Sequence, residues 1–83
     1  MNRSKLEDYL AIVTVLIVHG PLDVDKVESL SGVSQSTVRD DLSFLTKQKI
    51  VDEFKRDFLT YAASPLGVRL VKYFGRIPKN PAI

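Results

Sequence analysis

A glycine lies between two segments that each have the apolar spacing of a helix, and this constrains the fold more than any other feature. Asp23 can cap a short helix that runs to about Leu30, and Ser34 can cap a longer one from Gln35 to about Gln48. Between them stands only Ser31-Gly32-Val33, in which glycine permits the left-handed backbone that ends a helix abruptly. The sequence therefore predicts two helices that meet across a tight turn.

Both helices carry their apolar residues three or four positions apart, which places them on one face of each helix. The shorter helix is expected to bury Val24, Val27 and Leu30, and the longer one Val38, Leu42 and Leu45. The two faces can then share one core.

Another helix is predicted before this pair, from about Lys5 to His19, with Ser4 as its cap and Gly20-Pro21 as its end. Its inward face follows the spacing of four, three and four residues: Leu6, Leu10, Val13 and Ile17. The many β-branched residues in this segment favour a strand instead, but a stretch of this length without turn residues fits a helix better.

After Lys49 the pattern changes to two short apolar runs, residues 50–54 and 58–62, separated by Lys55-Arg56-Asp57. This alternation predicts a β-hairpin. Ser64-Pro65 then supplies a cap and a proline at the first position of a last helix, which ends near Gly75. The expected inward face of that helix is Leu66, Leu70, Tyr73 and Phe74.

A chain of 83 residues is long enough for one small domain, which we place at residues 1–75, followed by an extended or disordered tail at 76–83. The chain has no cysteine, which excludes disulfides and thiolate metal sites. Its longest apolar run, Leu10 to Val18, is far shorter than the roughly 20 residues that cross a bilayer. We therefore expect no membrane partner and, by default, a cytoplasmic location.

Basic residues gather in the last third of the chain. The net charge of +2 is too small to indicate a nucleic-acid partner by itself. Residues 1–54, however, carry a net charge of −3, whereas the residues from Lys55 onward carry +5. This distribution favours a basic surface near the hairpin, although each charge taken alone fits ordinary solvation.

The predicted order, a three-helix core, a short hairpin and a last helix, resembles the winged helix-turn-helix superfamily. The segment Leu30-Ser31-Gly32-Val33-Ser34-Gln35-Ser36-Thr37-Val38-Arg39 resembles the turn and the start of the recognition helix in those proteins. The segment Tyr61-Ala62-Ala63-Ser64-Pro65-Leu66-Gly67 is similar to the exit from the wing in small archaeal transcriptional regulators. The resemblance spans about Lys5 to Phe74 and implies a mostly helical α+β fold and a sequence-specific, double-stranded DNA-binding regulator of transcription.

One position departs from the pattern of this superfamily. The residue four positions before the turn glycine is usually small, because it packs between the two helices, and here it is Glu28. Either the local register differs or the second helix tilts outward.

The resemblance places the recognition helix, about residues 35–48, in the major groove, and a basic wing at 54–58 on the backbone or in the minor groove. With the apolar seam buried, polar side chains turn outward, among which Gln35 can pair with adenine and Arg39 with guanine. The candidate DNA-binding residues are Ser34, Gln35, Ser36, Thr37, Arg39, Ser43, Lys47, Lys55 and Arg56.

Two carboxylates on the recognition helix, Asp40 and Asp41, count against tight DNA binding because they would repel phosphate. They favour the alternative that the domain is a winged-helix protein-interaction module without DNA binding. The sequence offers no catalytic constellation, no phosphate-binding glycine loop and only one histidine, His19. We therefore expect no enzyme activity, no metal, no cofactor and no small-molecule substrate.

The first helix is apolar on nearly every side, which is typical of a helix buried on two faces. Its second stripe could meet another subunit together with residues of the last helix, which gives the predicted homodimer interface Ala11, Ile12, Val15, Val18, Val68 and Val71. Alternatively, the stripe packs within the monomer against the hairpin or the tail.

Overall fold

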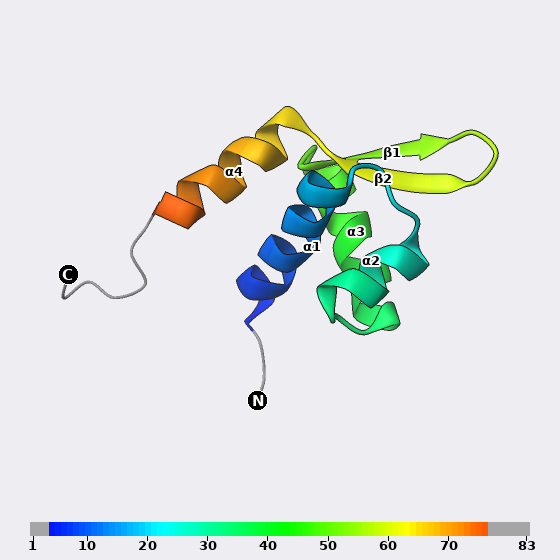
Figure 1. Ribbon diagram of the computed structural model, residues 1–83, viewed down its shortest axis with the longest axis horizontal. Coiled ribbons are helices and arrows are strands. Elements are labelled where there is room, and N and C mark those ends of the chain that lie inside the picture. The colour runs from blue at the N-terminus through cyan, green and yellow to red at the C-terminus, as the bar shows by residue number, and fades with distance from the viewer. Residues whose placement is uncertain (1–3, 77–83) are drawn as a thin grey trace.

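The computed structural model describes residues 4–76 and confirms the predicted mostly helical α+β fold, a winged helix (Figure 1). The elements follow in the order α1 (Lys5–His19), α2 (Val24–Ser31), α3 (Gln35–Lys47), β1 (Val51–Lys55), β2 (Leu59–Ala63) and α4 (Pro65–Arg76). Residues 77–83, most of the expected tail, lie outside the described residues. Arg76, expected in the tail, is instead the last residue of α4.

The helix ends form where the polar residues predicted them. The Ser4 hydroxyl accepts a hydrogen bond from the Glu7 amide, and the Glu7 carboxylate accepts one from the Ser4 amide in return. The Asp23 carboxylate accepts a hydrogen bond of 2.9 Å from the Lys26 amide at the start of α2. Gly32 ends that helix with a φ of 76°, a left-handed conformation that suits glycine. Local hydrogen bonding thus fixes the turn before α3.

The core lies between α1, α2, α3 and the base of the hairpin. Val33, in the turn between α2 and α3, is buried with the seam of α3. The buried apolar residues are Ile12, Val13, Leu16, Val27, Val33, Val38, Leu42, Leu45, Val51 and Tyr61. The predicted seam of α3 is therefore confirmed, whereas Leu30 of α2 is 45% exposed.

The buried face of α1 differs from the predicted one. Of the expected seam only Val13 is fully buried, whereas Leu6 is 46% and Ile17 38% exposed. Ile12 and Leu16 take the inner positions instead. Because α1 is apolar almost all round, its spacing fits more than one face, and packing against α2, α3 and β2 selects the one that is buried.

The hairpin is antiparallel and begins one residue later than predicted, with Val51 opposite Ala63 and Lys55 opposite Leu59. Leu22, from the loop after α1, extends it by exchanging two backbone hydrogen bonds with Tyr61, of 2.9 and 2.8 Å. Val51 and Tyr61 face the core and set this register. The turn therefore comprises residues 56–58, and Phe58 lies at the tip rather than in a strand.

Ser64 joins α4 to the end of α3. Its hydroxyl donates toward the carbonyl oxygens of Lys49 and Ile50, at 2.6 and 2.9 Å, and accepts a hydrogen bond from the Gly67 amide. From this junction α4 runs outward and diverges from α1 (Figure 1). Its expected inward face is wrong at Leu66 and Tyr73, which are 37% and 60% exposed, because only part of α4 packs on the body.

Candidate nucleic-acid interface

The side of α3 that faces away from the core carries the predicted contact residues. Ser34, Ser36, Arg39, Ser43 and Lys47 are exposed. Gln35 and Thr37 are half-buried near the turn. This places a row of hydrogen-bond donors and acceptors along an accessible helix, which is the arrangement that can read base edges.

Gln35 is already engaged within the protein. Its side-chain amide donates a hydrogen bond of 2.9 Å to the Asp25 carboxylate of α2. A bidentate contact with adenine needs both the amide and the carbonyl of glutamine, so this bond has to exchange before Gln35 can read a base. Sequence reasoning missed this partner because Asp25 lies ten residues away on another helix.

The start of α3 is open to an anion. Ser34 occupies the capping position, but its hydroxyl donates to the Thr37 hydroxyl at 3.0 Å instead of accepting from a backbone amide. The first-turn amides of α3 therefore have no side-chain cap and can donate hydrogen bonds to an acceptor from another molecule. A DNA phosphate next to Ser34 and Ser36 would satisfy them.

Arg39 connects this helix surface with the hairpin. Burial raises the pKa of the Tyr61 phenol above its usual 10.0, the carboxylate of Glu53 raises it further, and the positive charge of Arg39 lowers it. Strand β1 of the hairpin packs against α3, the helix that carries Arg39. Glu53 lies opposite Tyr61 in the hairpin.

The structure separates the two carboxylates that counted against DNA binding. Asp40 is exposed on α3, whereas Asp41 is only 1% exposed and turns inward. Its Oδ1 atom accepts a hydrogen bond of 2.7 Å from the Nζ atom of Lys5 in α1. The prediction that both acids face phosphate is therefore wrong for Asp41. Neighbouring residues on a helix point in different directions, and the packing of α3 turns Asp41 toward the interior and Asp40 toward solvent.

The wing carries two exposed cations and two exposed rings. Lys55 and Arg56 are exposed at and beside the turn, as predicted, and Asp57 follows them. Phe54 and Phe58 are also exposed, at 47% and 66%. Sequence reasoning did not single out these rings, because it placed both in the apolar runs of the hairpin, whereas Phe58 lies in the turn. The spacing in β1 could have predicted that Phe54 is exposed. Phe54 is three residues after buried Val51, so it lies on the opposite face of the strand.

Glu28 does not disturb the helix pair. It is half-buried, and its carbonyl accepts a hydrogen bond from the Gly32 amide at 3.1 Å. The small buried side chain at this end of α2 is Ser31, whose hydroxyl accepts from the Val33 amide. Gly32, Ser31 and Val33 thus form the turn without a small residue at position 28.

The predicted subunit interface is only partly available at the surface. Ile12 is 0% exposed and belongs to the core, so its assignment to an interface is wrong. Ala11 and Val71 are half-buried and pack against the core, Val15 and Val68 are half-buried, and only Val18 is well exposed, at 69%.

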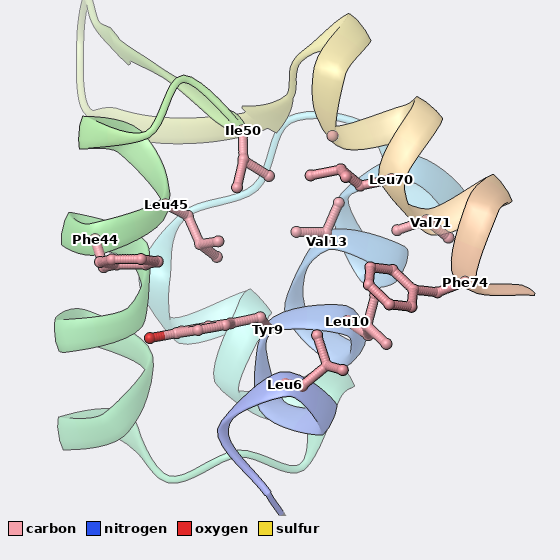
Figure 2. Close-up of a pocket in the computed structure, with 11 residues that line it drawn as sticks. Leu6, Tyr9, Leu10, Val13, Phe44, Leu45, Ile50, Leu70, Val71 and Phe74 are labelled. Carbon is pink, nitrogen blue, oxygen red and sulfur yellow. The ribbon is translucent and has the colours of Figure 1, made fainter.

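An apolar hollow opens between α1, α3 and α4 (Figure 2). Tyr9 of α1 reaches across to α3 and stacks on Phe44 with 5.1 Å between ring centroids. To the right of this pair Leu10 lies close to Phe74, with Leu70 above them (Figure 2). The lining is Leu6, Tyr9, Leu10, Val13, Phe44, Leu45, Ile50, Gly67, Leu70, Val71 and Phe74.

Among residues 4–76, no group of three or more histidine or acidic side chains is arranged to hold a metal ion. Within the same described range, no helix is long and apolar enough to pass through a bilayer.

Comparisons with known proteins agree with the fold. The family of DeoR-like helix-turn-helix domains matches residues 10–53. No curated protein matches the sequence.

Three solved structures illustrate the likeness. BpsR of Bordetella bronchiseptica, whose DNA binding is regulated by 6-hydroxynicotinic acid, matches 82% of this chain with a TM-score of 0.78 and 20% identity, over 50% of its own chain. A MarR family transcriptional regulator from Silicibacter pomeroyi matches 83% with a TM-score of 0.79 and 17% identity, over 47% of its own chain. The Zα domain of Carassius auratus PKZ, solved with Z-DNA, matches 70% with a TM-score of 0.64 and 17% identity, over 94% of its chain. The chain thus spans about half the length of the first two proteins.

Proposed function

The chain belongs to the family of DeoR-like helix-turn-helix domains, and on this basis we propose that it regulates transcription by binding a specific sequence of double-stranded DNA as a homodimer. It is a DNA-binding domain and not an enzyme. The observation that carries the proposal is that the polar and basic side chains predicted to contact DNA are accessible on α3 and on the wing, whose first strand packs against α3.

We assign different tasks to the parts of this surface. Arg39 and, after release from Asp25, Gln35 contact base edges in the major groove. Ser34, Ser36 and Thr37 hold a phosphate at the open start of α3, and Ser43 and Lys47 flank the groove. Lys55 and Arg56 contact the backbone from the wing, which adds affinity without sequence preference.

The proposed setting follows from this activity. A regulator acts where its DNA is, so we propose a cytoplasmic location. The segment from Tyr61 to Gly67 supports a place among the small archaeal regulators.

The test is a fluorescence-anisotropy titration of random-sequence duplex DNA from low to physiological salt. Removing Lys55 and Arg56 together should weaken binding at low salt and reduce the slope of log affinity against log salt by about 2. Arg39→Ala should weaken binding to a duplex selected from a random pool more than binding to the pool itself. The matched control replaces Arg69 and Lys72, two exposed cations on α4, with alanine.

The control separates a general charge effect from a wing contact, because both double variants lose the same charge. Equal losses in the two double variants contradict a wing contact. Absence of binding by the wild-type protein at low salt contradicts the DNA-binding proposal and favours the protein-interaction module.

The hollow between α1, α3 and α4 supports the homodimer. Leu6 and Phe44, which line it, leave 46% and 43% of their surface exposed. A surface patch of this kind marks an interaction site. We propose a second copy as the occupant, because α4 packs on its own body over only part of its length and two copies related by a two-fold axis can each place α4 in the hollow of the other.

Oligomeric state tests this choice. Leu6→Glu places a charge in the hollow, whereas Val18→Glu places one at the well-exposed residue of the stripe that the sequence predicted. By sedimentation equilibrium we expect the first variant to be monomeric and the second dimeric. The reverse result moves the interface to the stripe, and a monomeric wild type contradicts the homodimer.

A further inference from the structure

Two phenylalanine rings face solvent at the outer end of the wing. Phe58 is 66% exposed in the turn, and Phe54 is 47% exposed on the adjoining strand. The hairpin projects away from the helices (Figure 1), so its tip lies far from the hollow that we assign to a second copy. Exposed aromatic rings are costly in water, and their place at a projecting tip indicates that a partner covers them.

The surroundings of these rings indicate the chemistry of that partner. Phe54, Phe58, Pro21 and Thr60 line a shallow hollow together with Arg56 and Asp57. Lys55 and Arg56 lie between the two rings in sequence and are exposed. Apolar rings flanked by flexible cations complement a nucleic acid, whose bases are apolar on their faces and whose phosphates lie on both sides of them.

The geometry allows the tip to reach DNA that α3 has bound. Strand β1 packs against α3, so the wing begins beside the recognition helix. Strands of five residues extend about 17 Å, which is enough to cross a phosphate backbone from the major groove to the next minor groove. Phe54 lies directly opposite Thr60, on the strand face that points away from the core.

We propose that Phe58, supported by Phe54, is an apolar wedge that enters the minor groove and partly unstacks a base step, while Lys55 and Arg56 hold the phosphates on either side. The wedge rests on the proposed DNA binding and adds a specificity element to it. A wedge prefers steps that unstack easily, so the wing selects TA or CA steps without hydrogen bonds to their bases.

The test uses two duplexes of equal length. One alternates adenine and thymine and carries 2-aminopurine at its centre, and the other is an adenine tract with the same probe and no TA step. Wild-type protein should raise 2-aminopurine fluorescence at least about twofold in the alternating duplex, because the probe leaves the stack. Phe58→Ser should abolish the rise and weaken binding to this duplex by about tenfold, and Phe58→Leu should retain both.

Val18→Ser, which removes a similarly exposed apolar side chain from α1, outside the wing and the hollow, is the matched control and should behave as the wild type. Thermal melting checks that each variant is folded. We expect the Phe58 variants to be folded because this side chain is 66% exposed. If the wild type binds both duplexes but Phe58→Ser raises the fluorescence equally, the wedge is wrong and DNA binding stands. If wild-type fluorescence is unchanged although Phe58→Ser binds weakly, Phe58 is a surface contact and the wedge is again wrong. If the wild type binds neither duplex at low salt, both proposals fail.

Discussion

Asp41 belongs to the recognition helix but points away from the surface that we assign to DNA. It is almost fully buried, Oδ1 accepts from Lys5, and Oδ2 has no hydrogen-bond partner. A buried carboxylate costs free energy through lost hydration, and one exposed lysine compensates for it only in part. The Lys5–Asp41 pair therefore holds α1 against α3 but lowers the free energy of unfolding.

This arrangement predicts opposite effects for the two partners. Lys5→Met should lower the melting temperature, because it leaves the buried carboxylate without its partner. Asp41→Leu should raise it by about 5 °C, equivalent to about 1 kcal/mol, because a similar volume then fills the site without a charge. Thermal unfolding of both variants and of the double variant measures these effects. The double variant should match Asp41→Leu, and an additive result would contradict the coupling.

Tyr61 makes stability depend on alkaline pH. Burial and the neighbouring Glu53 carboxylate raise the pKa of the Tyr61 phenol above its ordinary 10.0, so folding favours the neutral form. The resulting stabilisation is complete below pH 10.0 and is lost as pH rises through the higher folded pKa. Tyr61→Phe should therefore lose less stability than the wild type above pH 10, measured as urea midpoints from pH 8 to 11. Tyr73→Phe, at an exposed ring, should keep the wild-type slope.

At the scale of elements, the junction between α4 and the hairpin depends on Gly67. A β-carbon at this position would come closer to the carbonyl oxygen of Ile50 than van der Waals contact allows. The glycine thus lets α4 approach the start of the hairpin, where Ser64 ties the two together.

Gly67→Ala therefore tests the junction, because we expect it to lower the free energy of unfolding, whereas helix propensity alone predicts an increase. Alanine stabilises an exposed helix by about 1 kcal/mol relative to glycine. Here we expect a loss of about 1–3 kcal/mol, because the backbone of Ile50 has to move. Differential scanning calorimetry measures it, with Arg69→Ala on the exposed side of α4 as the control. A melting temperature above that of the wild type would show that α4 does not need this approach.

The elements that sequence patterns predict well are those decided by neighbouring residues. The caps at Ser4 and Asp23 and the turn at Gly32 depend on residues within four positions, and the structure confirms them. The outward side of α3 was predictable because its apolar residues form one narrow seam. Local chemistry was thus sufficient to locate the recognition helix.

The sequence predictions were wrong where contacts between distant parts of the chain determine which residues are buried or paired. The apolar residues of α1 fit several faces, so only packing could show that Ile12 is buried and Leu6 is exposed. The hairpin shifted by one residue because Tyr61 pairs with Leu22 and turns inward, which moved Phe58 to the tip. Partners such as Asp25 for Gln35 also depend on the tertiary fold. The exposure of the candidate residues was therefore predicted better than their interactions.

At the scale of the whole molecule, the surfaces assigned to DNA and to a second copy lie on different parts of the chain. The first follows α3 and the wing, and the second lies between α1, α3 and α4. Because α3 contributes to both, the position of one copy fixes the direction in which its recognition helix points. A two-fold dimer then presents two recognition helices to half-sites about 34–36 Å apart along the duplex.

This coupling predicts how a dimer variant behaves on DNA. On a duplex selected by the wild type from a random pool and containing two half-sites, Leu6→Glu should reduce affinity to that for a single half-site. It should leave binding to the single half-site unchanged, because Leu6 lies outside the DNA surface. Inserting about five base pairs between the half-sites rotates one of them by half a turn, so the wild type should then bind the duplex no more tightly than a single half-site. Val18→Glu should bind every duplex as the wild type does. If Leu6→Glu weakens binding to the single half-site as well, the hollow supports the fold of α3 rather than a second copy.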